Sequence, residues 1–204
     1  MNAIGYGVNL IDKEKCCGVA LISNGFKDKA SEQAKINLEG IRKAAGRGES
    51  VLTTSSTCTF TIRDEYRHVL GLENDDVRDN IIMATKFIYE AVSSGRVRLV
   101  FRDDYRKRMA YHTPCHMEKL GWSIYSTSLL RLIPGVGLLM LDSQCCGIAG
   151  TYGFKKEHYN DSQKIGEPLF RQIRDSRADI VATDCETCKW QIEMSTGALV
   201  ENPI

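Results

Sequence analysis

The chain has 204 residues, enough for one large domain or two small ones that each bury a core. Its 27 basic and 26 acidic side chains leave a net charge of +1, which argues against a nucleic-acid-binding surface. The most apolar run, 129–141, is interrupted by Arg131, Pro134 and two glycines, so we expect no membrane-spanning segment.

Short apolar runs alternate with segments of helical periodicity along the chain. Strands are predicted at 7–11, 50–54, 96–101, 108–112, 136–142 and 178–184. Helices are predicted at 31–45, 76–93, 116–132, 157–174 and 185–194. This alternation is typical of an α/β fold in which small, largely parallel sheets are flanked by helices.

An internal repeat contains seven of the eight cysteines. "KCCGVA" at 15–20 resembles "QCCGIA" at 144–149, and "STCTF" at 56–60 resembles "ETCKW" at 186–190. Cys145 lies 129 residues after Cys16, and Cys188 lies 130 residues after Cys58. Because the blocks keep their order and offset, we predict two duplicated modules, at 1–95 and 96–204. We also expect Phe60 and Trp190, at equivalent positions, to pack in the core.

The first module has fewer cysteines than the second. Cys115 precedes the second Cys-Cys-Gly by 30 residues, and its counterpart would fall before Met1. Ser55 stands where the second module has Cys185. We therefore expect a chain cut from a longer protein, with a first module truncated at its N-terminus.

The cysteines of the second module follow predicted strands. Cys115, Cys145 and Cys185 each come shortly after the end of one. Because ligands collect beyond the carboxyl ends of parallel strands, the three loops are expected to converge on one site. Gly147 could supply the turn that lets adjacent cysteines reach it. The predicted ligands are Cys115, Cys145, Cys146, Cys185 and Cys188.

Three kinds of chemistry suit this pattern. The first is an iron–sulfur cluster, which can accept adjacent cysteines at different irons. The second is structural zinc in a module that docks other subunits, although five thiolates exceed the four ligands usual for zinc. The third is a thiol–disulfide oxidoreductase that uses Cys185 and Cys188 alone.

The remaining candidates are less complete. Cys16, Cys17 and Cys58 form a second set that binds a metal with help from Ser55 or a further cysteine, or binds nothing. His112 and His116 flank Cys115, and they either serve structural roles or contact a metal or sulfur.

At "CCG" and "CETC", with Cys115 upstream, the chain resembles the cysteine-rich CCG-domain family, which includes the B subunit of heterodisulfide reductase. "YHTPCHMEKLGW", "LDSQCCGIAGTYGFKKE" and "TDCETCKWQIEMST" resemble, more closely, the C subunits of anaerobic glycerol-3-phosphate dehydrogenases. Those subunits begin with ferredoxin-type cysteine runs, which are absent here, so the resemblance indicates a carboxyl-terminal portion.

The resemblance implies a non-catalytic electron-transfer subunit. Its cofactor would be an iron–sulfur cluster of the [4Fe-4S] kind, including the noncubane type. Its partners would be flavin-bearing catalytic subunits, from which electrons pass toward menaquinone in anaerobic respiration. The complex would hold it peripherally at the cytoplasmic side of the inner membrane.

Overall fold

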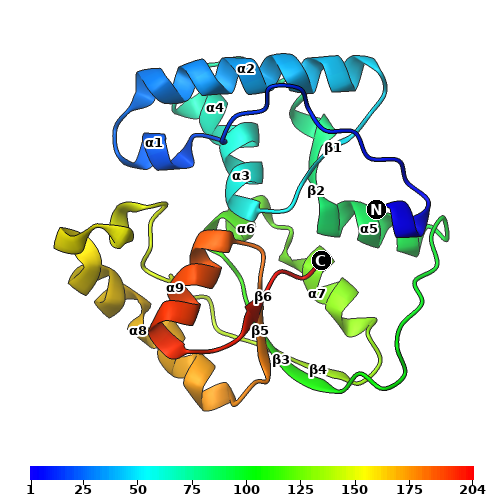
Figure 1. The fold of residues 1–204 in the computed structure, drawn as a ribbon, viewed down its shortest axis with the longest axis vertical. Coiled ribbons are helices and arrows are strands. Elements are labelled where there is room, and N and C mark those ends of the chain that lie inside the picture. The colour runs from blue at the N-terminus through cyan, green and yellow to red at the C-terminus, as the bar shows by residue number, and fades with distance from the viewer. The chain divides into compact units, whose positions relative to one another are not determined.

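The computed structural model describes all residues, 1–204, as two compact units, Met1–Val100 and Phe101–Ile204. Each unit contains a small parallel sheet with helices, so the prediction of an α/β fold built from two duplicated modules is confirmed (Figure 1). No helix has both the length and the apolar character needed to cross a bilayer.

The first unit contains a two-stranded sheet. Its elements are η1 (Asn2–Ile4), α1 (Val19–Ser23), α2 (Lys27–Gly46), β1 (Val51–Thr53), α3 (Ser56–Phe60), η2 (Thr61–Glu65), α4 (Tyr66–His68), η3 (Arg78–Asn80), β2 (Ile81–Met83) and α5 (Ala84–Ser93). Strands β1 and β2 pair in parallel, with Val51 opposite Ile81. Helix α2 buries Ala34, Leu38 and Ile41, whose three- and four-residue spacing places them on one face.

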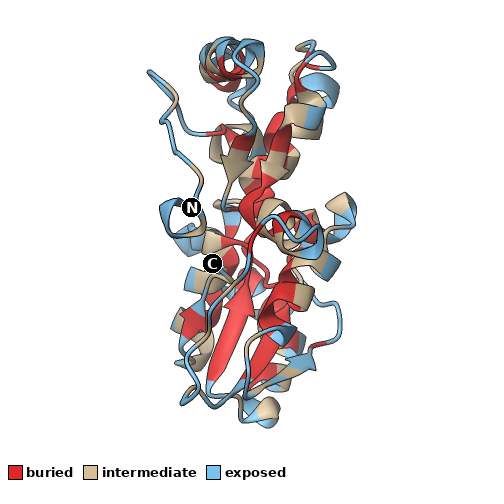
Figure 2. Cartoon of the chain, turned by 90° about the vertical axis from the view of Figure 1, so that its right-hand side faces the viewer, coloured by how far each residue is buried: buried red, intermediate tan, exposed pale blue.

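The second unit contains a four-stranded parallel sheet. Its elements are β3 (Lys107–His112), α6 (Cys115–Leu120), α7 (Ser123–Arg131), β4 (Val136–Met140), η4 (Tyr152–Phe154), η5 (Lys156–His158), α8 (Tyr159–Ser176), β5 (Ile180–Thr183), α9 (Glu186–Thr196) and β6 (Val200–Glu201). The strand order is β4-β3-β5-β6, and every neighbouring pair is parallel. Strand β5 and the second half of β3 are buried (Figure 2).

The two faces of the second sheet have separate cores. Ala110 and Val181 pack with Phe170 of α8 on one face, together with Cys146, Cys185 and Cys188. Met109, Tyr111, Ile180 and Ala182 form the other core with Leu130 of α7. Because successive residues of a strand point to opposite faces, the buried apolar side chains of β3 and β5 alternate between the two cores.

Two predicted strands are wrong. Residues 7–11 correspond in the repeat to β4, but they form no strand. Strand β4 is held by its pairing with β3, whereas no strand of the structure pairs with 7–11. Residues 96–101 are also irregular, and the Val97 amide instead donates to the Ala91 carbonyl at the end of α5.

The predicted helices 76–93 and 116–132 each differ from the structure. Residues 81–83 form β2 because they pair with β1, so the helix α5 begins only at Ala84. The second segment divides into α6 and α7 at Gly121, whose φ of 69° ends α6. The core position expected for Trp190 is wrong, because this residue is 54% exposed and Phe154 is its aromatic neighbour.

Candidate metal centre

Three neighbouring strands of the second sheet end beside cysteines. Cys115 begins α6 three residues after β3, Cys145 lies five residues after β4, and Cys185 lies two residues after β5. These strands are adjacent and parallel, in the order β4-β3-β5, so their carboxyl ends lie at one edge of the sheet. The loops that carry the predicted thiol ligands therefore leave from the same edge, as expected.

Gly147 forms a turn after the adjacent cysteines. Its φ is +86°, and a Cβ at this position would lie 2.1 Å from the backbone oxygen of Ser162. The Gly147 amide donates a hydrogen bond to the Cys145 sulfur at 3.3 Å. Cys146 is buried, whereas Cys145 is exposed, so the turn presents one thiol to the core and the other to the surface.

Cys185 and Cys188 lie at the beginning of α9. Cys185 is the residue before the helix, with an extended backbone, and both side chains are at least 96% buried. The Cys188 sulfur lies 3.1 Å from that of Cys146, and the Cys185 sulfur lies 3.2 Å from the Thr187 hydroxyl. The first turn of a helix favours ionised thiols because its amide groups carry partial positive charge.

The five thiols influence one another electrostatically. Hydrogen bonds with Cys145 and Cys188 hold the pKa of the Cys146 thiol well below its usual value. The same bonds raise the pKa of Cys145 and of Cys188. Burial and the charges of Cys146 and Cys185 raise the pKa of Cys115. The thiols therefore cannot all ionise together unless a cation compensates their charge.

The five thiols of the second unit do not form a preassembled metal-binding cluster. All eight cysteines are free thiols, and no three cysteine, histidine or acidic side chains already surround a metal-sized point. Cys115 and Cys145 are exposed; Cys115 is the first residue of α6 and Cys145 lies in the loop after β4. A donor set composed of sulfur selects soft metals such as iron in clusters or zinc.

Asp184 is a buried carboxyl next to this site that the sequence did not single out. Tyr111 donates to one of its oxygens at 2.5 Å, and Ser126 donates to the other at 2.9 Å. Burial raises the pKa of Asp184 to about 6, although both hydrogen bonds oppose the shift. The side chain of Asp184 projects toward α7. Side chains alternate between the two faces along β5, and Ala182, two residues earlier, lies on the α7 face of the sheet.

His112 is the last residue of β3 and is 1% exposed. Neither ring nitrogen has a hydrogen-bond partner. Burial lowers the pKa of His112 to about 4, and the charge of Cys146 opposes this shift. His116 lies in α6, where its backbone amide donates to the sulfur of Cys115.

The first unit brings its three cysteines together. Cys16, Cys17, Cys58 and Ser55 line one hollow of about 310 Å³. A hydrogen bond to Cys58, together with burial, raises the pKa of the Cys17 thiol. The hollow therefore has three cysteine sulfur atoms, with the Ser55 hydroxyl at the position of Cys185, where the second unit has five cysteine sulfur atoms.

The two units support their Cys-Cys-Gly loops differently. The Asn37 side chain accepts from the Lys15 amide at 2.8 Å and donates to the Cys16 carbonyl at 3.3 Å. The equivalent residue, 129 positions later, is Gly166, where a Cβ would lie 2.7 Å from the Cys146 carbonyl oxygen. The first unit thus holds its Cys-Cys-Gly loop through the Asn37 side chain, whereas in the second unit the helix backbone at Gly166 packs directly against the loop.

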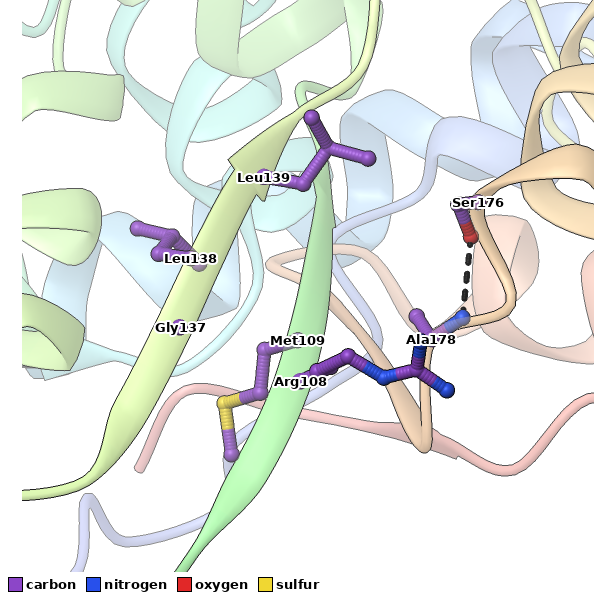
Figure 3. A pocket seen from close by; sticks show the side chains of 7 residues that line it. All are labelled: Arg108, Met109, Gly137, Leu138, Leu139, Ser176 and Ala178. Carbon is purple, nitrogen blue, oxygen red and sulfur yellow. Dashed lines mark hydrogen bonds between the residues drawn. The ribbon is translucent and has the colours of Figure 1, made fainter.

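A second hollow, of about 270 Å³, lies away from the thiols. Arg108, Met109 and residues 137–139 line it near the beginnings of β3 and β4, with Ser176 and Ala178 beside them (Figure 3). It contains no sulfur ligand other than the Met109 thioether. It therefore offers no set of metal ligands.

Residues 1–63 and 109–193 match the model of the CCG cysteine-rich domain family. The chain belongs to this family. The two matched segments contain the two Cys-Cys-Gly loops and all eight cysteines.

Curated relatives extend the comparison. The chain is 58% identical to the C subunit of the anaerobic glycerol-3-phosphate dehydrogenase of Escherichia coli, over 100% of this chain and 51% of that protein. It is 26% identical to the D subunit of the dihydromethanophenazine:CoB–CoM heterodisulfide reductase of Methanosarcina barkeri, over 98% of this chain and 49% of that protein. An uncharacterized iron-sulfur protein of Methanocaldococcus jannaschii is 27% identical, over 96% of this chain and 36% of that protein. The chain thus spans about half the length of its first two relatives.

Proposed function

We propose that this CCG-domain chain is an iron–sulfur electron-transfer module. The observation that carries the proposal is the convergence of Cys115, Cys145, Cys146, Cys185 and Cys188 at one edge of the second sheet. The ligands are these five residues, acting as thiolates. The name of the Methanocaldococcus jannaschii relative supports the iron–sulfur assignment.

The five-sulfur set fits a polynuclear cluster better than a single metal ion. Zinc takes four ligands in structural sites, whereas a cluster presents several iron atoms over a wider surface. Exposed Cys145 and buried Cys146 face different directions, which suits ligation of different irons. We propose a [4Fe-4S] cluster, of the noncubane type if all five thiolates bind. Such a cluster supplies one-electron transfer, at potentials that span about −700 to +450 mV among iron–sulfur proteins.

The partners follow from the similarity to the Escherichia coli protein. We propose that the chain works in an anaerobic glycerol-3-phosphate dehydrogenase complex, where it takes electrons from flavin-bearing catalytic subunits and passes them toward menaquinone. The chain would then be held at the membrane through the complex. Cys16, Cys17 and Cys58 are proposed as an incomplete second site, which binds a metal only if a further ligand joins them.

Metal analysis after anaerobic purification tests the cofactor. We expect iron and acid-labile sulfide in equal amounts, with an electron paramagnetic resonance (EPR) signal in one redox state. Zinc without iron or sulfide would overturn the proposal in favour of a docking module. Thiol–disulfide exchange activity after complete removal of metal would instead favour an oxidoreductase using Cys185 and Cys188.

Electron flow tests the role in the complex. Glycerol 3-phosphate should reduce the flavin and then a menaquinone analogue when the complex contains the unaltered sequence. With Cys146→Ser, flavin reduction should persist while quinone reduction is lost. Equal quinone reduction by both forms would show that electrons bypass this module.

A further inference from the structure

His112 has a buried ring with no hydrogen-bond partner, which is unusual for a polar group inside a protein. It stands at the carboxyl end of β3, three residues before Cys115. Either the two ring nitrogens of His112 remain buried without hydrogen bonds, which is destabilising, or the ring faces a group that binds there.

The strand geometry directs the His112 ring toward the cysteine-containing face. Ala110, two residues earlier on β3, packs in the core that includes Cys146, Cys185 and Cys188. Tyr111, between them, belongs to the opposite core. Because side chains alternate along a strand, His112 projects on the same side as Ala110. The charge of Cys146 acts on the pKa of His112 and raises it, against the effect of burial, which is consistent with this placement.

Thr183 is the neighbour of His112 across the sheet. The two residues are in register, so their side chains project from the same face. Thr183 is 1% exposed, and its hydroxyl also lacks a hydrogen-bond partner. Two adjacent strands thus end in unpartnered polar groups on the face that contains three of the proposed ligands.

We propose that the His112 ring N–H and the Thr183 hydroxyl donate hydrogen bonds to sulfur atoms of the cluster that the five thiolates hold. This inference rests on the proposed function. His112 and Thr183 are then positioning and tuning residues, because they contact the cofactor's sulfur without supplying a ligand to iron.

Hydrogen bonds to sulfur withdraw electron density from a cluster and so favour its reduced form. Removing the His112 donor should therefore make the reduction potential more negative. The loss should be about tenfold in the equilibrium constant for reduction, which is about 59 mV for one electron. Thr183→Val should change the potential in the same direction, while a retained donor in His112→Gln should restore part of the loss.

The test compares iron and sulfide content, potential and nitrogen coupling in four variants. These are His112→Phe, His112→Gln, Thr183→Val and, as control, Thr127→Val. Thr127 is also a buried threonine of this unit, but its hydroxyl already donates to the Ser123 carbonyl at 3.0 Å. We expect full iron content throughout, lowered potentials for the first and third variants, and an unchanged potential for the control.

Pulsed EPR with nitrogen-15-labelled histidine separates a hydrogen bond from a metal bond. Weak coupling that disappears in His112→Phe supports the proposal. Strong coupling, with iron lost from that variant, would make His112 a ligand and overturn it. Unchanged potentials in both His112→Phe and Thr183→Val would also overturn it. If His112→Phe failed to fold, an unchanged potential in Thr183→Val would by itself overturn the proposed pair of hydrogen bonds. Absence of iron from the unaltered chain would instead refute the proposed function before any variant is compared.

Discussion

Cys146 and Cys188 lie 42 residues apart in the sequence, yet their sulfur atoms are 3.1 Å apart. The contact joins the Cys-Cys-Gly loop to the first turn of α9, so it connects two of the three loops of the proposed site. The pKa of Cys146 is lowered, whereas the pKa of Cys188 is raised. Cys146 is therefore the thiol of the pair that ionises more readily.

This contact predicts which disulfide forms when metal-free protein meets an oxidant. With hydrogen peroxide as the oxidant, we expect Cys146 to form a sulfenic acid, which the Cys188 thiol attacks to give a Cys146–Cys188 disulfide and water. Peptide mapping without reduction, by mass spectrometry, measures the product. Protein loaded with its cluster should resist this oxidation, because the thiolates are bound. A dominant disulfide between Cys185 and Cys188 would contradict the expectation and favour a thiol–disulfide enzyme.

Replacement of one proposed ligand tests the five-thiolate set. Cys146→Ser should lose more than half of the iron and sulfide, because Cys146 is the buried thiol that most readily ionises. Cys17→Ser is the matched control, since Cys17 is a buried thiol at the position of the first repeat block that corresponds to Cys146. Unchanged iron content in Cys146→Ser would remove this residue from the ligand set.

Much of the second unit could be predicted from the sequence. Strands β3, β4 and β5 follow from apolar runs that end near cysteines, and the repeat indicated a duplicated fold. Residues 7–11 have the same apolar character, yet they form no strand, and no segment of the structure pairs with them. A strand requires two paired segments, and the pattern of one segment does not show whether another pairs with it.

The polar part of the site was less predictable for a related reason. A histidine, threonine or aspartate at the end of a strand is equally compatible with a solvated loop. Burial of His112 and Asp184 depends on α7, α8 and α9 covering the sheet, which is a tertiary effect. The cysteines were easier to recognise, because eight thiols in a chain of 204 residues are uncommon unless they bind a metal or take part in redox chemistry.

The buried groups His112 and Asp184 predict opposite contributions to stability in the metal-free, reduced chain. Burial raises the pKa of Asp184 from 3.8 to about 6, so its stabilising contribution is complete below 3.8 and is lost as the pH rises through 6. Burial lowers the pKa of His112 from 6.5 to about 4, so its contribution is complete above 6.5 and is lost as the pH falls through 4. Each shift changes the free energy of unfolding by roughly 3 kcal/mol across its pH range.

Denaturant unfolding between pH 4 and 6.5 measures these contributions. The free energy of unfolding of Asp184→Asn should decrease as the pH falls, because only the His112 contribution then still changes with pH. His112→Gln should lose stability as the pH rises, because the aspartate effect remains. The double variant should show neither trend. Parallel pH profiles for the unaltered chain and both single variants would contradict the assigned pKa directions.

Gly147 predicts a strong dependence of the site on one backbone position. An alanine there would need a φ near +86° and would place its Cβ 2.1 Å from the Ser162 backbone oxygen. The left-handed conformation costs about 1–2 kcal/mol for a residue with a Cβ, and displacing the α8 backbone adds to this. We expect Gly147→Ala to lower the free energy of unfolding by roughly 3 kcal/mol and to reduce iron content.

Gly197→Ala is the control for the conformational part of this effect. Gly197 has a φ of +69° after α9, but a Cβ there would meet no atom within 4 Å. Its substitution should cost about 1 kcal/mol in the free energy of unfolding and leave iron content unchanged. If the two variants lose equal stability, steric contact with Ser162 does not constrain the Cys-Cys-Gly turn. If Gly147→Ala keeps its full iron content, the thiols of Cys145 and Cys146 do not depend on that turn for their position.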